Sequence, residues 1–325
     1  MSDRSVHIGI DLGGTSIQAA AVRGGEVLAS DKTKTRPDEG VDAVIDRIVG
    51  AANAVRDDLD EPEAVAGLCI GAPGTIDVAR GVVRTAPNLG WTDVALGDRL
   101  SGALGLPVVL DNDVNIGAVG EHVHGAGRGA LDMAAIFVGT GIGGALIVDG
   151  HSHAGFRGAA AEFGHMVAVQ GGRPCPCGRE GCFEAYASKK AMESIVREKI
   201  EQGRQSIVLE IMEDKGKDRM TSSVIEAALE ADDAVMIEVV HEARIHLGFL
   251  TANIVNAFDP QVVVFGGGVV ERLGHDFVDP IAVEARGHFL QRKGAEEVKI
   301  VPAALGDHAG TVGAAVVAQR AFFGG

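Results

Sequence analysis

Hydrophobic and polar positions along the chain predict alternating strands and helices, beginning with a hairpin. Residues 6–11 alternate apolar with small or polar side chains, and after a glycine-rich break the pattern resumes over residues 17–22. Two such runs around glycines are typical of a β-hairpin. A similar unit returns later, where apolar residues 134–138 and 145–148 flank a second glycine-rich break. We therefore expect the chain to contain the same module twice.

The segment between the two hairpins has the element order of an α/β half. Its pattern predicts helices near 41–59, near 93–105 and from about residue 114, and strands at 65–70 and 108–110. The second half of the chain turns helical after an irregular stretch that carries cysteines. A sheet covered by helices is therefore expected in the first half.

A long helix is predicted over residues 232–258. Its apolar residues recur every three or four positions and form one stripe: Leu247, Leu250, Ile254 and Phe258. Asp259-Pro260 ends this helix, because proline cannot continue one. A buried strand at 261–265 follows, and a last helix near 309–322 is expected to pack back across the first domain.

The repeated module places a domain boundary near residue 122. We predict a smaller α/β lobe from residues 1–122 plus about 306–325, and a larger α/β lobe from residues 123–305. The length of 325 residues is enough for two domains that each bury a core. The hydrophobic content of 46% with 4% aromatics predicts a core of Val, Ile, Leu and Ala.

The net charge and the uncharged stretches of the chain argue against nucleic acid and membranes as partners. A net charge of −16, with no cluster of Lys and Arg, argues against nucleic acid as a partner. The N-terminus runs straight into a strand-like segment without the apolar core of a signal peptide, and the uncharged stretch 133–148 is broken by glycines. We expect a cytoplasmic protein that has no membrane partner.

Three glycine turns follow apolar strands and can hold phosphate. They lie at residues 13–15, 139–144 and 266–268. Glycines let backbone N–H groups approach an anion, although each turn taken singly is more often a tight turn without a ligand. None is a Walker loop, and none is expected to open a helix. Asp11 beside the first turn would repel phosphate unless a cation lies between them, which predicts Mg²⁺; the alternative is a turn or capping Asp.

Four residues have the spacing of a zinc site. His165, Cys175, Cys177 and Cys182 form the pattern H-x9-C-x-C-x4-C. Nitrogen and sulfur ligands without a carboxylate predict a closed, structural Zn²⁺ site that orders an otherwise irregular loop. The alternative is three unliganded thiols and a surface histidine. Cys69 stands alone in an apolar strand and is expected in the core.

Carboxylates near this cluster and near residue 112 are candidates for chemistry. Glu162 and Glu184 flank the zinc ligands, so a rigid loop would aim both at one point and suit sugar hydroxyls, although either alone is more often a solvated acid. Asp113 follows a strand and precedes a helix. It is either an N-cap or a general base.

Taken together, these motifs resemble the ROK family of sugar kinases and sugar-responsive repressors. The motifs that carry the resemblance are Asp11-x-Gly-Gly-Thr, Asn112-Asp113-x-Asn115, Glu162-Phe163-Gly164-His165 and Cys175-x-Cys177-Gly-x-x-Gly181-Cys182-x-Glu184. They occur in the family's order from residue 6 to beyond residue 268. One departure is the stretch Gly158-Ala159-Ala160-Ala161, which carries Ala where the family has a second Gly.

The resemblance implies two actin-like, RNase H-like lobes with a cleft between them, and a homodimer or higher homo-oligomer formed by the second lobe. It implies Asp113 as the catalytic base. The implied sugar contacts are Gly74, Asn88, Asn112, Asp113, Glu162, His165 and Glu184. The implied nucleotide contacts are Asp11, Gly13, Gly14, Thr15, Thr140, Gly141, Gly266, Gly267 and Gly268. Zn²⁺ would be structural, with Mg²⁺ and ATP completing the site.

The implied reaction is ATP-dependent phosphorylation of a hexose at the 6-hydroxyl. The segment 182–188 resembles the glucokinase branch most, which favours glucose. N-acetylglucosamine, N-acetylmannosamine, fructose and allose stay open as alternatives. A sugar-sensing regulator and an actin-like or chaperone-like ATPase are the rival classes; the first carries a DNA-binding segment ahead of the kinase-like part, and the second does not need Glu162 and Glu184.

Overall fold

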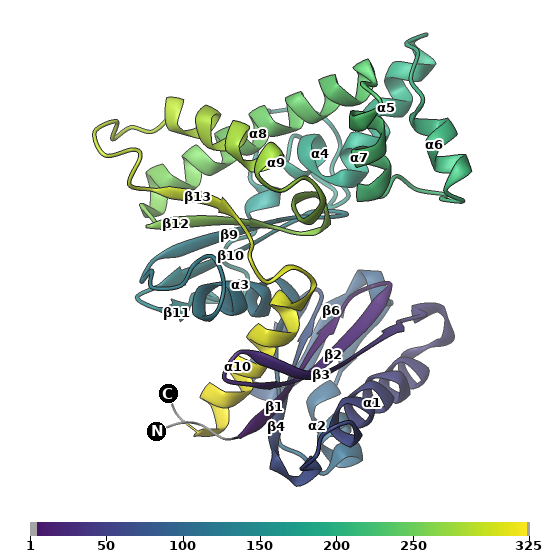
Figure 1. Ribbon diagram of the computed structural model, residues 1–325, viewed down its shortest axis with the longest axis vertical. Coiled ribbons are helices and arrows are strands. Elements are labelled where there is room, and N and C mark those ends of the chain that lie inside the picture. The colour runs from purple at the N-terminus through teal and green to yellow at the C-terminus, as the bar shows by residue number, and fades with distance from the viewer. Residues whose placement is uncertain (1–4, 324–325) are drawn as a thin grey trace. The chain divides into compact units, whose positions relative to one another are not determined.

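A computed structural model describes residues 5–323 of the protein, in two compact units (Figure 1). Within the described residues, the first unit contains 5–129, 152–160 and 307–323, and the second contains 130–151 and 161–306. Each unit has its own apolar core. The contacts assign 152–160 to the first unit, whereas the sequence analysis grouped this segment with the larger lobe.

The sheet of the first unit has five strands in the order β3-β2-β1-β4-β8. They are β1 (Val6–Leu12), β2 (Ser16–Arg23), β3 (Glu26–Lys34), β4 (Val65–Ala72) and β8 (Val108–Asn112). Strands β1 and β2 are antiparallel, with His7 opposite Val22 and Leu12 opposite Ile17. Strands β1, β4 and β8 run parallel. The predicted hairpin is confirmed.

The second unit repeats this arrangement. Its sheet has the order β11-β10-β9-β12-β13. The strands are β9 (Met133–Val138), β10 (Ile142–Val148), β11 (His151–Ser152), β12 (Val262–Gly266) and β13 (Lys299–Pro302). Strands β9 and β10 form an antiparallel hairpin, and β9, β12 and β13 are parallel. The predicted repeat of one module is therefore confirmed strand by strand.

Helices cover both faces of the first sheet. The described helices of this unit are α1 (Val41–Asp57), α2 (Leu96–Leu104), α3 (Asp113–Val123) and α10 (Ala309–Phe323). Leu68 and Ile70 of β4 join the core with α1 and α2, whereas Cys69 between them packs with Ile116 of α3 and Ala314 of α10. This alternation follows from the two-residue period of a strand. It also confirms that Cys69 lies in the core.

In the second unit, the longest helix is α8 (Ala234–Phe258). It ends at Phe258, before the Asp-Pro pair, as predicted, and the capping residue Asp259 adopts a left-handed conformation with φ of 48°. The other helices described in this unit are α4 (Glu184–Ala187), α5 (Lys189–Glu201), α6 (Val208–Asp214), α7 (Ser222–Glu230) and α9 (Gly268–Gly287). Their buried residues pack with those of the sheet into one large cluster.

The predicted helix at 93–105 is shorter than expected. It begins at Leu96, and Trp91–Val94 forms strand β7 instead. Strand β7 pairs with β6 (Val82–Ala86), which pairs with β5 (Thr75–Asp77), in a small antiparallel sheet. In the described part of the chain, no helix is long and apolar enough to cross a membrane.

Candidate functional site

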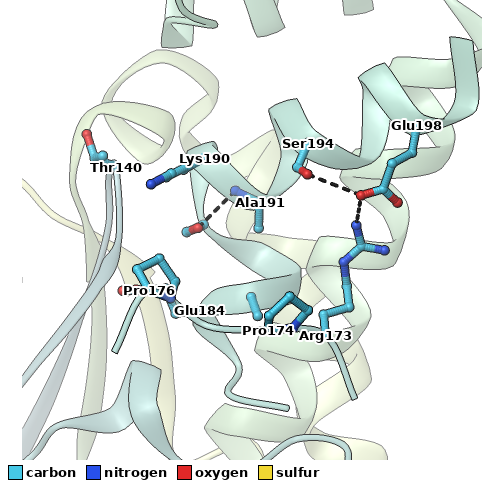
Figure 2. A pocket seen from close by; sticks show the side chains of 11 residues that line it. Thr140, Arg173, Pro174, Pro176, Glu184, Lys190, Ala191, Ser194 and Glu198 are labelled. Carbon is cyan, nitrogen blue, oxygen red and sulfur yellow. Dashed lines mark hydrogen bonds and ion pairs between the residues drawn. The ribbon is translucent and has the colours of Figure 1, made fainter. Parts of the chain in front are cut away.

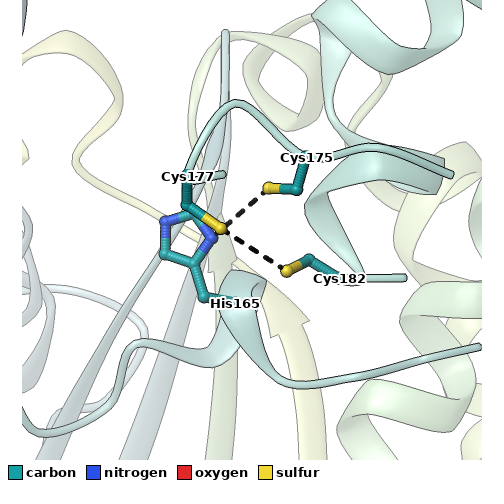
Figure 3. A group of neighbouring side chains, drawn as sticks. All are labelled: His165, Cys175, Cys177 and Cys182. Atoms are coloured by element: carbon teal, nitrogen blue, oxygen red, sulfur yellow. Dashed lines mark hydrogen bonds between the residues drawn. The ribbon is translucent and has the colours of Figure 1, made fainter. Parts of the chain in front are cut away.

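The four predicted zinc ligands lie together in the second unit (Figure 3). The ligand atoms of His165, Cys175, Cys177 and Cys182 are all within 4.8 Å of one another. Cys175 Sγ lies 3.7 Å from His165 Nδ1, and Cys177 Sγ lies 3.7 Å from Cys182 Sγ. Two sulfurs each about 2.3 Å from a tetrahedral zinc would lie about 3.8 Å apart. The residues therefore have the chemistry and spacing of a closed zinc shell.

Backbone hydrogen bonds shape the loop of residues 174–182 that carries the cysteines, which we call the metal loop. Cys175 N–H donates to Arg179 O at 2.8 Å, and Gly178 N–H donates to Cys175 O at 3.0 Å. At Gly181, φ is 78° and an added Cβ would lie 1.7 Å from Val169 O, so only glycine fits. The loop is folded tightly enough to present its sulfurs to one point.

The thiols differ in acidity. Burial raises the pKa of Cys175 to about 12 and also raises the pKa of Cys182. Burial opposes ionisation of Cys177 as well, but hydrogen bonds from Arg179 and the neighbouring thiols lower its pKa to about 6. A bound metal needs all three as thiolates, so a divalent cation would displace the protons that burial otherwise retains.

Two glutamates lie beside the ligand residues in the chain. Glu184 begins α4, two residues after Cys182. Its Oε2 accepts the N–H of Ile142 at 2.8 Å, and its Oε1 lies 3.9 Å from Cys175 Sγ. Glu162 precedes the 3₁₀ turn Phe163–His165, and its carbonyl accepts the N–H of His165 at 3.0 Å. Glu162 is thus bonded through its backbone to the ligand residue His165, and Glu184 contacts the ligand residue Cys175 through its side chain.

The first glycine turn joins β1 to β2 in the first unit. Gly13 N–H donates to Ser16 O at 2.9 Å, and Thr35 Oγ1 donates to Gly13 O at 2.7 Å. Asn88 lies beside this turn, because a Cβ at Gly14 would stand 3.4 Å from Asn88 Cβ. A predicted phosphate turn and a predicted sugar contact are therefore neighbours.

Asp11 is a carboxylate without a hydrogen-bond or ion-pair partner among the described residues. Helix α10 approaches it closely: a Cβ at Gly310 would stand 2.7 Å from Asp11 Oδ2. Burial raises the pKa of Asp11 to about 7; Asp113 adds to this rise, Lys32 opposes it, and Asp307 adds a smaller part. Such uncompensated negative charge suits a cation.

Lys32 and Asp307 are residues near Asp11 that the sequence analysis missed. Lys32 Nζ and Asp307 Oδ2 form an ion pair at 3.1 Å between β3 and the turn before α10. They are 275 residues apart, and neither lies in a motif. The expected return of the last helix to the first domain was the only signal that could have indicated their proximity.

Asn112 and Asp113 have distinct positions at the start of α3. Asn112 is the N-cap, and its Oδ1 accepts the N–H groups of Val114 at 2.9 Å and Asn115 at 3.2 Å. Asp113 is the first residue of the helix, so the N-cap interpretation of Asp113 is wrong. Asn112 Nδ2 also donates to Gly74 O at 3.3 Å, which brings the Gly74 loop to the same place.

The other two glycine turns lie in the second unit. The turn at 139–144 connects β9 to β10, and Gly139 O and Thr140 O accept the N–H groups of Lys189 and Lys190 at the start of α5. The third turn directly precedes α9, with Gly267 as its N-cap. The expectation that none of the turns opens a helix was therefore wrong for this one. The N-terminus of a helix favours anions, so the correction strengthens a phosphate site.

Each unit thus brings together part of the predicted site. Around the first sheet lie Asp11, Gly13, Gly14, Thr15, Gly74, Asn88, Asn112 and Asp113. Around the second lie Thr140, Gly141, Glu162, His165, Glu184, Gly266, Gly267, Gly268 and the three cysteines. The two repeated α/β sheets, each with a glycine turn at its hairpin, agree with the two actin-like lobes that the resemblance to sugar kinases implied.

Comparison with known proteins identifies the family. The ROK family model matches residues 7–321, so the chain belongs to the ROK family. It is 35% identical to a glucokinase of Halalkalibacterium halodurans over 323 residues, 96% of this chain and 94% of the relative. A crystal structure of a Streptomyces griseus ROK glucokinase in complex with glucose and AMPPNP matches with a TM-score of 0.85 and 33% identity, covering 97% of this chain and all of the other.

Regulators of the same family match over less of their own length. The xylose repressor of Bacillus subtilis is 29% identical over 78% of this chain and 60% of the repressor. The glucokinases match this chain nearly from end to end. The enzyme reading is therefore better supported than the regulator.

Proposed function

We propose that this protein transfers the γ-phosphoryl group of ATP to the 6-hydroxyl of glucose. Full-length similarity to glucokinases supports the reaction. The observation that carries the catalytic assignment is the start of α3, where Asn112 takes the capping role and Asp113 stands beside Asp11. A carboxylate in this place can accept the proton of a sugar hydroxyl.

The sugar contacts that we propose come from both units. Their carboxylate, amide and imidazole groups can hydrogen-bond hydroxyls, and Gly74 offers backbone groups. The set is Gly74, Asn88, Asn112, Asp113, Glu162, His165 and Glu184. The attachment of Glu162 and Glu184 to the metal loop supports their use as rigid acceptors.

The proposed nucleotide contacts are the three glycine turns and Asp11. The set is Asp11, Gly13, Gly14, Thr15, Thr140, Gly141, Gly266, Gly267 and Gly268. Mg²⁺ bound near Asp11 would neutralise phosphate charge. The shortage of positive partners around Asp11 supports this assignment.

Each proposed residue has its own role in the reaction. Glu162 and Glu184 orient the sugar, Asp113 accepts the proton of its 6-hydroxyl as the phosphoryl group arrives, and backbone N–H groups of the glycine turns hold the phosphates. Because the proton moves late, Asp113 needs correct placement above all. We assign the smaller predicted lobe to phosphate and sugar binding and the larger one to the zinc loop and further nucleotide contacts.

We assign the cluster of His165, Cys175, Cys177 and Cys182 to a structural Zn²⁺. The sulfur spacing of 3.7 Å and the absence of a carboxylate from the four ligands support a closed shell. Reduced thiols are needed for this role, which favours the cytoplasm.

The variant Asp113→Asn tests the catalytic assignment. It keeps the shape of the side chain but removes the proton acceptor, so we expect turnover to fall at least about a hundredfold while glucose binding by calorimetry stays nearly intact. The control is Asp98→Asn, an exposed aspartate on α2. Near-normal turnover in Asp113→Asn would remove Asp113 from its role.

The choice of glucose over other hexoses rests on similarity alone. Discrimination between sugars depends on hydrogen bonds whose loss strands a buried polar group. N-acetylglucosamine, N-acetylmannosamine, fructose and allose are the alternative substrates.

We also propose a homodimer or higher homo-oligomer formed by the second unit, where Phe249, Val283 and Leu290 are exposed. Light scattering after size-exclusion chromatography measures the molar mass in solution and therefore the oligomeric state.

A further inference from the structure

A cavity of about 170 Å³ lies inside the second unit, between the metal loop and α5 (Figure 2). Thr140 of the second glycine turn lines one side, Pro174 and Pro176 of the metal loop line another, and Lys190 of α5 contributes a cation. All of its walls belong to one unit. It is large enough for several waters or a small anion.

The charged side chains around this cavity differ in whether they have a hydrogen-bond or ion-pair partner. Arg173 pairs with Glu198, and Glu184 accepts the N–H of Ile142. Among the described charged residues that line the cavity, only Lys190 has no ion-pair or hydrogen-bond partner for its side chain. Its amine points toward the Thr140 side in Figure 2. One ammonium group is therefore available there to a ligand.

The backbone holds Lys190 directly behind the phosphate turn. Ser188 caps α5 by accepting the N–H of Ala191 at 3.1 Å, and Lys190 N–H donates to Thr140 O at 3.4 Å. The first N–H groups of α5 are thus already used, so an anion here would bind to side chains rather than to the helix end. The adjacent Lys189 differs, because it is half-buried and lies near Glu271.

We propose that Lys190 and Thr140 form a subsite for the phosphate oxygens of the phosphoryl donor. The proposal rests on the function proposed above and adds a cation to the donor site. An ammonium group with three donors and a hydroxyl, next to a glycine turn, can bind phosphate oxygens from two directions. If Lys190 contacts the donor equally well in the bound complex and in the transition state, losing this contact raises KM for the donor and leaves turnover nearly unchanged.

The test compares Lys190→Ala, Lys190→Arg and Lys215→Ala, the last being an exposed lysine after α6. In Lys190→Ala, we expect KM for ATP to rise about tenfold, with turnover and KM for glucose each changing less than about twofold. Lys190→Arg keeps a cation and should stay within about threefold of the wild type. Lys215→Ala should match the wild type. Unfolding midpoints of all variants show whether the fold is kept.

Binding of tripolyphosphate by titration calorimetry gives a second readout that does not depend on turnover. Lys190→Ala should bind it about tenfold more weakly, and added salt should weaken the wild type more than this variant. Equal affinity in both proteins, an equal loss in Lys215→Ala, or no binding by the wild type would overturn the subsite. A wild type that binds tripolyphosphate through Lys190 but does not phosphorylate glucose would overturn the proposed function alone.

Discussion

Asp11 is the residue at which the proposed Mg²⁺ site has the clearest consequence for stability. A buried carboxylate with negative neighbours destabilises the folded protein when it is ionised and no cation is bound. The backbone of α10 packs against it, so water cannot replace the missing partner fully. This is the charge pattern that a Mg²⁺ site near the phosphates requires.

Removing this charge is predicted to stabilise the metal-free protein. Asp11→Asn should raise the free energy of unfolding at pH 8 by about 4 kcal/mol, lower turnover, and raise the Mg²⁺ concentration needed for half-maximal turnover. Denaturant unfolding in chelator measures the first effect. Asp46→Asn, an exposed aspartate on α1, is the control. Destabilisation by Asp11→Asn would contradict the account.

The same residue predicts a pH dependence. The folded pKa of about 7 lies above the ordinary value of 3.8, so the unfolded chain loses its proton first. The contribution of Asp11 to stability is therefore fully present below pH 3.8 and is lost as pH rises to about 7. The difference in unfolding free energy between wild type and Asp11→Asn should grow over this window and level off above it. A difference that does not change with pH would contradict the assignment.

Sequence predicted some residues well and others poorly. The cluster of His165 and the three cysteines was predictable, because the spacing of these residues is local and typical of metal coordination. The role of Asp113 was ambiguous, because either Asn112 or Asp113 can cap a helix and only the structure shows that Asn112 does. Ala161, in the stretch that departs from the family, has φ of 61°, a conformation that costs a non-glycine residue about 1 kcal/mol.

At the scale of elements, α3 positions the proposed base. Its cap is predicted to matter for stability and for the Gly74 loop alike. Asn112→Ala should lower the free energy of unfolding by about 1 kcal/mol, whereas Asn112→Ser should keep most of the cap and lose only the amide contact to Gly74. Denaturant unfolding of both variants measures the difference. Equal losses in the two variants would show that the cap is not the cause.

The metal loop is the second element that we propose positions sugar-binding side chains. Removing the metal with a chelator, or replacing Cys177 by Ser, should release the loop and weaken glucose binding at least about tenfold, while ATP binding survives. Calorimetry with each ligand separates the two effects. Cys69→Ala, which removes a core thiol, should keep one zinc per chain. Unchanged glucose affinity after metal loss would contradict the positioning role.

The strands of the two hairpins and the long helix α8 were predictable at this scale, whereas strand β7 and helix α9 were not. Residues 93–94 of strand β7 were predicted to begin a helix, because a strand of four residues is too short for a periodic signal. Helix α9 begins at Gly268, the last of three glycines that the sequence analysis interpreted as a turn alone. Glycine is an acceptable N-cap, so the same residues serve both purposes.

At the scale of the whole molecule, the repeat of one sheet arrangement is the main organising feature. Both sheets combine an antiparallel hairpin with parallel strands in the same order. The sequence predicted this repeat because glycine turns mark each hairpin. It did not indicate that 152–160 joins the first unit, because that segment carries no periodic pattern.

A hexose panel in a coupled assay of ADP release tests the central claim most directly. With ATP and Mg²⁺, we predict ADP release that depends on the sugar, is fastest for glucose in kcat/KM, and yields glucose 6-phosphate in equal amount. N-acetylglucosamine, N-acetylmannosamine, fructose and allose are the comparison sugars, and Asp113→Asn is the inactive control. ADP release at the same rate without any sugar would contradict the account and favour an ATPase.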